Sequence, residues 1–405
     1  MRRVLVAIVI LITAAFWFLP VSAALAQAES TNLNVNIDAL DAQLAQPVPS
    51  DLAPDTYAVA KVVAIEAEGT TALGGVSQPY QTVKLEVMSG PEKGKQLTVD
   101  HGKEVTIRDY QKVKPGQKVV LLKTSGVDGQ DTYFIADAYR LPSLGWVFVV
   151  FFVLVIFFGR WRGLTSIIGM VVSLLVISSF IIPRILHGAN PLGMSLLGAV
   201  AIAVISLYVA HGFNRRTSIA LGSTLITLVL ATGLALLFVS LAKLTGVGTD
   251  EAFYLQFGPL NALNLKGLLL GGIIIGALGV LDDITTGQTA AVEEIYKANP
   301  ALPARELVRR GLSVGREHIA SLVNTLVLAY AGASFPLLLL FTMNTTVPAW
   351  TTLNSEFVAE EIIRTLVGSS ALVLAVPIAT VLAAKFIVRK RRASSTAEGR
   401  TLGHF

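Results

Sequence analysis

Two adjacent carboxylates interrupt an apolar stretch of this sequence. Asp282 and Asp283 stand in the text GALGVLDDITTGQ, and Thr285, Thr286 and Gln288 follow within two helical turns. An aspartate inside a membrane span costs about 2.5–3.5 kcal/mol, so its presence there indicates a function. Hard cations bind oxygen ligands, which these side chains offer. We expect a cation or proton site; the alternative is a hydrogen-bonded aspartate that joins helices or lies in a vestibule.

Helical geometry separates the two carboxylates. Asp282 and Thr286 lie one above the other at positions i and i+4, whereas Asp283 points about 100° away. At about 1.5 Å per residue, Asp282 lies about two-thirds of the way through its span. These are the only carboxylates that we place well inside an apolar run. The pair therefore cannot share one face of the helix, nor can both face lipid.

The same predicted helix is rich in glycine. Its glycines are Gly267, Gly271, Gly272, Gly276 and Gly279, and two pairs of them are four residues apart. This spacing lets helix backbones approach closely in a membrane. We expect these glycines to serve in helix packing, with a glycine-lined pore as the alternative.

The next apolar run supplies a possible polar partner. It begins with GREHIASLVNT, in which Asn324 lies a turn or so inside the membrane. Because helices joined by one loop usually pack together, we expect Asn324 to reach the segment 283–288. The alternative is a purely structural interhelical hydrogen bond. The preceding stretch, residues 305–318, alternates Arg with apolar residues and predicts an amphipathic helix at the membrane surface.

The residue types argue against an enzyme. An intramembrane aspartyl protease needs a second Asp-bearing span, a metalloprotease needs H-E-x-x-H, and a P-loop needs its glycine-rich motif; none occurs. The chain has no cysteine, which excludes disulfides and thiolate metal sites. We expect no catalytic residues and no cofactor, and the sequence does not identify a metal.

The composition is that of a multi-pass membrane protein. Of 405 residues, 53% are hydrophobic and 15% are charged, against about 25% charged in soluble proteins. Apolar runs long enough to cross a ~30 Å hydrocarbon core recur after residue 142. We predict seven spans, at about 144–159, 164–182, 192–210, 218–242, 267–289, 319–341 and 361–384.

The residues before the spans have a different character. Residues 1–26 resemble a cleaved signal peptide, with an uncleaved helix as the alternative, and 27–54 read as a flexible leader. Five short runs between turn signals predict a small all-β domain, possibly OB-like, over residues 55–142. The seven-span domain would occupy 143–388 and a basic tail 389–405. The expected strands are Tyr57–Ile65, Thr82–Met88, Gln96–Val99, Lys118–Lys123 and Tyr133–Ala136.

The distribution of basic residues predicts the orientation. One set of loops carries Arg160, Arg162, Arg215, Arg216, Lys297, Arg305, Arg309, Arg310 and Arg316, and the tail continues this excess. The opposite loops carry only Arg184, Lys243 and Lys266. Since basic loops stay in the cytoplasm, the β domain is expected outside and the C-terminus inside, as the signal peptide also requires.

Two segments resemble the YibE/F-like membrane protein family, of the YibE type. They are GALGVLDDITTGQTAAVEEI and GREHIASLVNTLVLAYAGASFP, with Leu281 preceding a double aspartate where the family usually has Met-Asp. The resemblance implies this architecture and a bacterial origin. Family members are often presumed to be transporters, and some genomes encode them in pairs. A second multispan YibE/F-like protein is therefore one expected partner, beside a homo-oligomer.

Two functions are expected from these observations. The first is a bacterial inner-membrane permease or channel for a small solute, coupled to a cation or proton through Asp282 or Asp283. The second is a non-transporting scaffold or sensor whose β domain binds an envelope partner. The lipid bilayer is a partner in both, and nucleic acid in neither.

Overall fold

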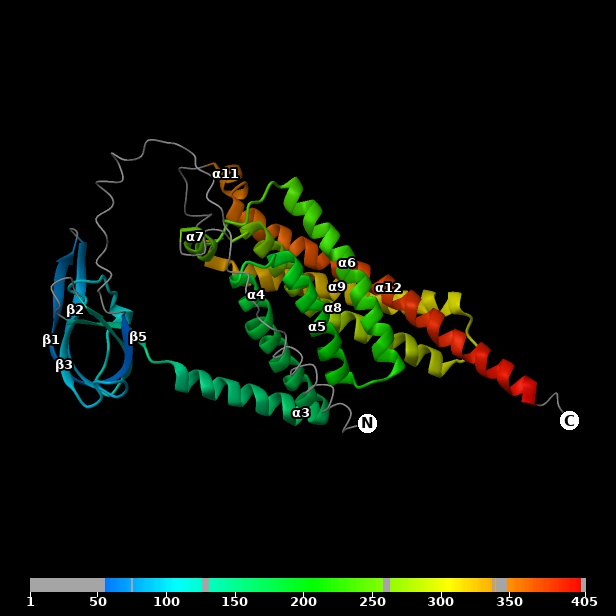
Figure 1. Cartoon of the computed structure of the whole chain (residues 1–405), viewed down its shortest axis with the longest axis horizontal. Coiled ribbons are helices and arrows are strands. Elements are labelled where there is room, and N and C mark those ends of the chain that lie inside the picture. Colours follow the sequence, from blue (N-terminus) through cyan, green and yellow to red (C-terminus); the bar gives the residue numbers. More distant parts are fainter. Residues whose placement is uncertain are drawn as a thin grey trace. The chain divides into compact units, whose positions relative to one another are not determined.

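The chain divides into a β unit and a helical unit, with the boundary between Val153 and Leu154 (Figure 1). The predicted signal peptide and leader, residues 1–54, lie outside the described residues. The side chains of the basic tail from residue 389 onward lie outside them as well. The computed structural model describes residues 55–73, 76–125, 131–257, 263–336, 339 and 348–401.

The β unit is a five-stranded antiparallel sheet of strand order β3-β2-β1-β4-β5. All five predicted strands are confirmed, and each begins earlier or ends later than the predicted run, although β2 ends one residue before the predicted Met88. A short 3-10 turn, Asp109–Gln111, follows β3. The strands are β1 (Thr56–Leu73), β2 (Val76–Val87), β3 (Gln96–His101), β4 (Lys118–Ser125) and β5 (Asp131–Ala138).

The core of the β unit follows from alternating side chains. Val83, Leu85 and Val87 occupy alternate positions of β2 and are buried, as are Val119 and Leu121 of β4. Side chains two apart share one face of a strand, so this alternation buries one face of the sheet. Ladder bonds do not join the edge strands β3 and β5 within the described residues, so the OB-like closure stays a prediction.

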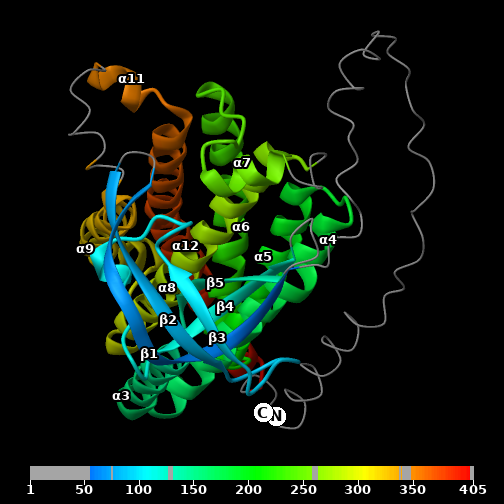
Figure 2. The same cartoon turned by 90° about the vertical axis from the view of Figure 1, so that its left-hand side faces the viewer.

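The helical unit is shown from a second side in Figure 2. Short helices α7 (Asp250–Phe257) and α11 (Ala349–Leu353) stand between the long ones, and a π-helical turn, Ile177–Ile181, precedes α4. The other helices are α3 (Leu141–Val176), α4 (Ile182–Leu186), α5 (Pro191–His211), α6 (Arg215–Leu241), α8 (Leu265–Ala298), α9 (Ala304–Ala333) and α12 (Glu356–Thr401).

Five helices within the described residues are long and apolar enough to cross a membrane, so the predicted count of seven spans is not confirmed. The first, Leu141–Leu186, combines the first two predicted spans. Its backbone leaves the helical region at Arg160 (φ 50°, ψ −132°), between those two runs. α9 is not among the five; it joins the predicted surface helix 305–318 and the start of the sixth predicted span into one helix.

α8 is the central helix of the bundle. Of its most apolar window, 56% is buried inside the protein, more than in the other four span-length helices. Leu278 and Leu281 of α8 pack in one core cluster with Ala203 of α5, Ala231 of α6 and Ala375 of α12. The small alanines let these neighbours lie close to α8, which holds the segment with the two aspartates in the middle of the bundle.

Asparagine caps start three of the long helices. Asn190, Asn214 and Asn264 precede α5, α6 and α8, and each side-chain oxygen accepts a hydrogen bond from the backbone N–H three residues later. Such a cap satisfies one of the free N–H groups of the first turn. The sequence therefore fixes where α8 begins, and with it the depth of Asp282.

Candidate functional site

The aspartate pair lies on α8, with its two side chains in different surroundings. Asp282 is half-buried, and its Oδ1 atom is buried without a hydrogen-bond partner in the described part of the chain. Asp283 is exposed. The carboxylates therefore diverge, as the helical geometry predicts. A buried carboxylate oxygen without a donor is free to take a proton or a cation.

Thr285 links the aspartate segment to α6. Its hydroxyl donates to the carbonyl of Leu281 at 2.8 Å and lies 2.7 Å from the hydroxyl of Thr224. Because the single proton of Thr285 is used on its own helix, Thr224 is the donor between the two hydroxyls. The Thr286 hydroxyl donates to the carbonyl of Asp282 at 2.8 Å, so its hydrogen bond stays within α8.

A second contact sets the register of α6 against α8. Arg216 and Glu293 form an ion pair at 3.5 Å, seventy-seven residues apart in the sequence. Together with the Thr224–Thr285 contact, it shows that the two helices run antiparallel. The residues opposite the aspartates on α6 are therefore those just after Thr224.

Gln288 forms a buried joint between three helices, which we call the Gln288 joint: Gln288, Gly311, Gly315 and Thr380. The Gln288 side chain is fully buried, and its Nε2 donates to the Gly311 carbonyl at 2.7 Å and to the Thr380 hydroxyl at 2.8 Å. A Cβ atom on Gly315 would lie 2.3 Å from Val376 Cγ1 and 3.1 Å from Gln288 Nε2. Glycine is therefore required where α9 crosses α8 and α12.

Three buried polar atoms near this end of α8 lack partners among the residues described. They are Gln288 Oε1, Thr289 Oγ1 and Thr217 Oγ1, and their side chains are at most 1% exposed. A buried polar atom without a partner costs free energy, so such atoms mark a site for water, an ion or a proton. Asp282 lies about two turns before Thr289 on the same helix, so α8 carries unpartnered polar atoms on Asp282, Gln288 and Thr289.

Asn324 lies on α9, the helix that contacts Gln288. Its side chain is exposed on α9, and the α9 residues that contact Gln288 are Gly311 and Gly315. The reach of Asn324 to residues 283–288 therefore stays a prediction, and glycines of α9 supply the contact with Gln288.

The glycines of α8 fall into two groups. A Cβ atom on Gly271 would lie 2.3 Å from Ser195 Oγ of α5, so this glycine permits a close helix contact, as predicted. Gly267 lies beside its own cap, Asn264, within the first turn. Gly272 and Gly279 face open space, and Gly276 has only the Tyr330 hydroxyl, 3.6 Å from its Cβ position.

These open glycines form one stripe with Asp283. Gly272, Gly276, Gly279, Asp283 and Gly287 follow one another at three- and four-residue steps, and all are exposed. Residues at this spacing lie on one face of a helix. α8 therefore presents a face of bare backbone and one carboxylate, which we call the α8 glycine face.

Sequence reasoning missed a second polar contact, the Glu356 cradle, formed by Glu356, Glu360 and the loop 245–248. Glu356 Oε1 accepts the N–H groups of Thr245 and Gly246, the latter at 2.7 Å, and both its oxygens lie 2.9 Å from the Thr245 hydroxyl. Glu360, only 2% exposed, accepts the N–H of Gly248 at 2.9 Å. The sequence signal was the pair of glycines, 246 and 248, in a short loop.

The cradle borders an open cavity of about 410 Å³. Lys243 and Asn354 line it beside Glu356, together with leucines from the ends of α6 and α11. Lys243 has a positive φ of 54°, the conformation in which glycine usually ends a helix. The lining of the cavity thus includes one cationic side chain, Lys243, and one anionic side chain, Glu356.

The charged groups of the β unit form a cluster around Glu92. Burial raises the pKa of Glu92, but the hydrogen bonds from Tyr133 and Lys123 outweigh this effect. The net pKa of Glu92 therefore lies below its usual value. The Asp131 carboxylate and then Glu92 raise the pKa of Lys123. Both groups therefore stay charged at neutral pH. Groups of three or more His, Cys, Asp or Glu that would hold a metal do not occur in the described residues.

Comparison with known proteins assigns the helical unit to a protein family. The model of the YibE/F-like protein family matches residues 147–389. The chain belongs to the YibE/F-like family. Searches of the curated proteins and of the solved structures found no match.

The YibE/F-like match covers both polar regions of the bundle. Asp282, Gln288 and Glu356 all lie inside it, whereas the five strands of the β unit lie before it. With several helices able to span a membrane, the YibE/F-like chain is a multi-pass membrane protein. The predicted resemblance to this family is confirmed.

Proposed function

We propose that this chain is a bacterial inner-membrane permease or channel for a small solute, linked to a cation or proton through Asp282 and Asp283. The observation that carries the proposal is the α8 glycine face. It exposes Asp283 and four glycines on the central helix, inside the stretch that is apolar enough to span the membrane. A carboxylate facing lipid is costly, so such residues in membrane proteins face a water-filled cavity or another protein.

α9 supplies a second polar wall. Ser321, Asn324 and Thr325 are exposed on it. Tyr330 of α9 lies next to Gly276 of the α8 glycine face. Polar side chains from two neighbouring helices, with glycines between them, are suited to line a hydrated path, which makes Asn324 a pathway residue even though it does not contact Gln288.

Asp282 is suited to the coupling role. Its buried, unpartnered oxygen lies one residue from the exposed Asp283, so the two carboxylates face the bundle interior and the proposed path, respectively. Thr285 and Thr286 present oxygen atoms whose protons are used on their own helix, which leaves lone pairs for a cation. The coupled ion is thus a proton or a hard cation.

The proposed arrangement keeps the predicted topology. Seven spans result when the bend at Arg160 separates two spans and α9 is counted as one. The signal peptide is removed, the β unit lies outside, and the C-terminus lies in the cytoplasm, in agreement with the basic loops. There the β unit gates the entrance or recruits a partner.

Flux through liposomes tests the proposal. We expect purified chain to conduct protons or a cation, and Asp282→Asn to lower that flux at least about tenfold, because a neutral amide neither carries a proton nor binds a cation as a carboxylate does. Asp283→Asn is expected to lower it less. Glu294→Gln, which removes an exposed carboxylate paired with Lys297 on the same helix, is the control and keeps full flux.

One observation favours a second function. Gly272 and Gly279 leave open space that a partner helix would fill, as in a scaffold built from a homo-oligomer or from two YibE/F-like proteins. Folded, correctly oriented protein that shows no flux over a panel of ions, with Asp282→Asn and Asp283→Asn both neutral in the cell, would establish the scaffold and refute the permease.

A further inference from the structure

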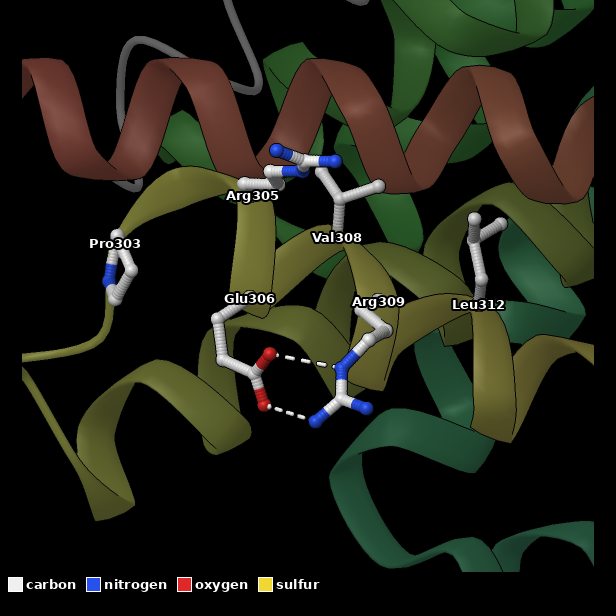
Figure 3. A pocket seen from close by; sticks show the side chains of 6 residues that line it. All are labelled: Pro303, Arg305, Glu306, Val308, Arg309 and Leu312. Carbon is white, nitrogen blue, oxygen red and sulfur yellow. Dashed lines mark hydrogen bonds and ion pairs between the residues drawn. The ribbon is translucent and has the colours of Figure 1, made fainter.

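The first turns of α9 carry an open depression with a mixed lining. It measures about 490 Å³ and is lined by Pro303, Arg305, Glu306, Val308, Arg309 and Leu312. Most of the exposed lining belongs to apolar groups, and the charged residues of the lining are Arg305, Glu306 and Arg309. We call it the α9 groove (Figure 3).

The charged side chains at the α9 groove differ in their ion-pair partners. Glu306 accepts two hydrogen bonds from Arg309, both at 2.8 Å, and one from Arg310, also at 2.8 Å. These guanidinium groups, Arg309 first, lower the pKa of Glu306 to about 2, so it stays a carboxylate. Arg305 takes part in no ion pair among the described residues, and Figure 3 shows its side chain extending away from the Glu306–Arg309 pair. The lining thus carries two guanidinium groups and one carboxylate, and the groove is positive.

The apolar part of the lining is fixed by packing. Val308 and Leu312 lie one turn apart on α9 and are half-buried against the core, while Leu307, directly before Val308, is fully buried. The groove therefore has a firm apolar floor beside its cationic side chains. α9 runs from this charged end toward an apolar C-terminal part, the pattern of a helix that enters a membrane from its surface.

We propose that the α9 groove binds an anionic phospholipid, with its phosphate on Arg305 and Arg309 and the start of an acyl chain against Val308 and Leu312. Charge complementarity selects the occupant: the arginines fit an anionic headgroup, and the apolar floor fits the chain that a free phosphate lacks. Membrane-surface helices with arginines on the polar face are attracted to anionic lipids in this way. This site is independent of the proposed ion pathway.

Native mass spectrometry of the full chain tests the proposal, with dioleoyl phosphatidylglycerol and dioleoyl phosphatidylcholine added in turn. We expect the wild-type chain to retain phosphatidylglycerol in preference. Arg305→Gln and Arg309→Gln are each expected to lower its affinity about fivefold, the effect of one cationic side chain near an anionic lipid. Arg316→Gln is the matched control: it removes one arginine from the same face of α9, about 16 Å further along, and changes the affinity less than twofold.

A variant that is expected to bind the lipid more tightly provides a control for misfolding, because a misfolded chain would lose binding. Glu306→Gln frees Arg309 and Arg310 from their carboxylate, so we expect phosphatidylglycerol to bind about two- to fivefold more tightly. Three results overturn the proposal: equal retention of phosphatidylcholine, an equal loss in Arg316→Gln, or an affinity that falls in Glu306→Gln. Displacement of the lipid by millimolar inorganic phosphate would also overturn it, because the groove would then be a simple anion site.

Discussion

The Gln288 joint and the Glu356 cradle both tie distant segments of the bundle together with polar side chains, but they do so differently. At the joint, one neutral amide donates twice and leaves its own oxygen without a partner in the described residues. In the cradle, the carboxylate of Glu356 accepts several donors from one loop, mostly backbone N–H groups.

The difference reflects the cost of burial. A carboxylate away from water needs several strong donors, whereas an amide tolerates an unpaired lone pair at lower cost. The cradle is thus a fixed contact in which the donors are backbone N–H groups of one loop and the Thr245 hydroxyl. The joint retains an unused acceptor beside Thr289, whose hydroxyl is also without a partner in the part of the chain described. We infer that the cradle serves stability and that the end of α8 with the joint retains capacity for a ligand.

The largest expected effect concerns the loop of the cradle. Gly246 has φ +88°, and a Cβ atom there would lie 2.4 Å from the Leu265 carbonyl oxygen. Gly246→Ala adds backbone strain of about 1–2 kcal/mol to an overlap of about 1–3 kcal/mol, so we expect a loss of about 3 kcal/mol in unfolding free energy. Unfolding of the full chain in mixed micelles measures it.

Gly188→Ala is the control for that prediction. Gly188 has a similar φ of +85° but no atom within 4 Å of its Cβ position, so only the strain remains. Equal losses in the two variants would show that the loop moves easily and that the cradle is not a fixed contact.

A smaller effect is expected from the carboxylate itself. Glu356→Leu leaves the N–H groups of Thr245 and Gly246 without their acceptor, and we expect a loss of about 2 kcal/mol in unfolding free energy. Glu361→Leu, which breaks only the ion pair with Arg364 at 2.9 Å, should cost less than about 1 kcal/mol. A cradle variant no worse than this control would contradict the structural role of the cradle.

Removing the neutral side chain of the Gln288 joint should lower the unfolding free energy less than removing the Glu356 carboxylate. Gln288→Leu removes two interhelical hydrogen bonds, and such bonds in membranes contribute about 0.6–1.7 kcal/mol in unfolding free energy. Thr232→Val, which loses one hydrogen bond within its own helix, is the control and is expected to be nearly neutral. A Gln288→Leu loss above that of Glu356→Leu would reverse the comparison. The same micelle unfolding provides the measurement.

The smallest effect is expected where flexible side chains, rather than backbone, surround a carboxylate. Glu92 in the β unit is such a case, and its pKa lies below the usual value. Its folded-state pKa is depressed, so its contribution is present above about pH 4.5 and lost as the pH falls through the folded pKa. Glu92→Gln should therefore speed amide exchange in β5 slightly at pH 7, and match wild type at pH 3. A difference that grew toward pH 3 would refute this.

Periodic patterns predicted the elements well, because each pattern is local. Alternation in 82–88 placed β2, and the apolar runs at 192–210, 218–242 and 267–289 placed α5, α6 and α8. The break between the first two predicted spans coincides with the non-helical Arg160. Helical geometry alone likewise predicted that the side chains of Asp282 and Asp283 point in different directions.

The contacts between elements were not predictable in the same way. Glu356 accepts hydrogen bonds from a loop more than a hundred residues earlier in the chain, and it precedes the apolar run, so no local pattern singles it out. Asn324 was singled out on α9 because it is polar, whereas the α9 residues that contact Gln288 are two glycines. Close helix approach depends on the absence of a side chain, and which of many glycines is used depends on the crossing point of the helices.

The length of α9 gives the Gln288 joint a mechanical role. α9 continues without a break from Ala304 to Ala333, and at about 1.5 Å per residue the stretch beyond Gly315 extends ~27 Å. A tilt of only ~5° about the joint therefore moves the far end of this rigid rod by ~2 Å. We expect the joint to act as a fulcrum, so that a change at the charged end of α9 produces a displacement beside Gly276.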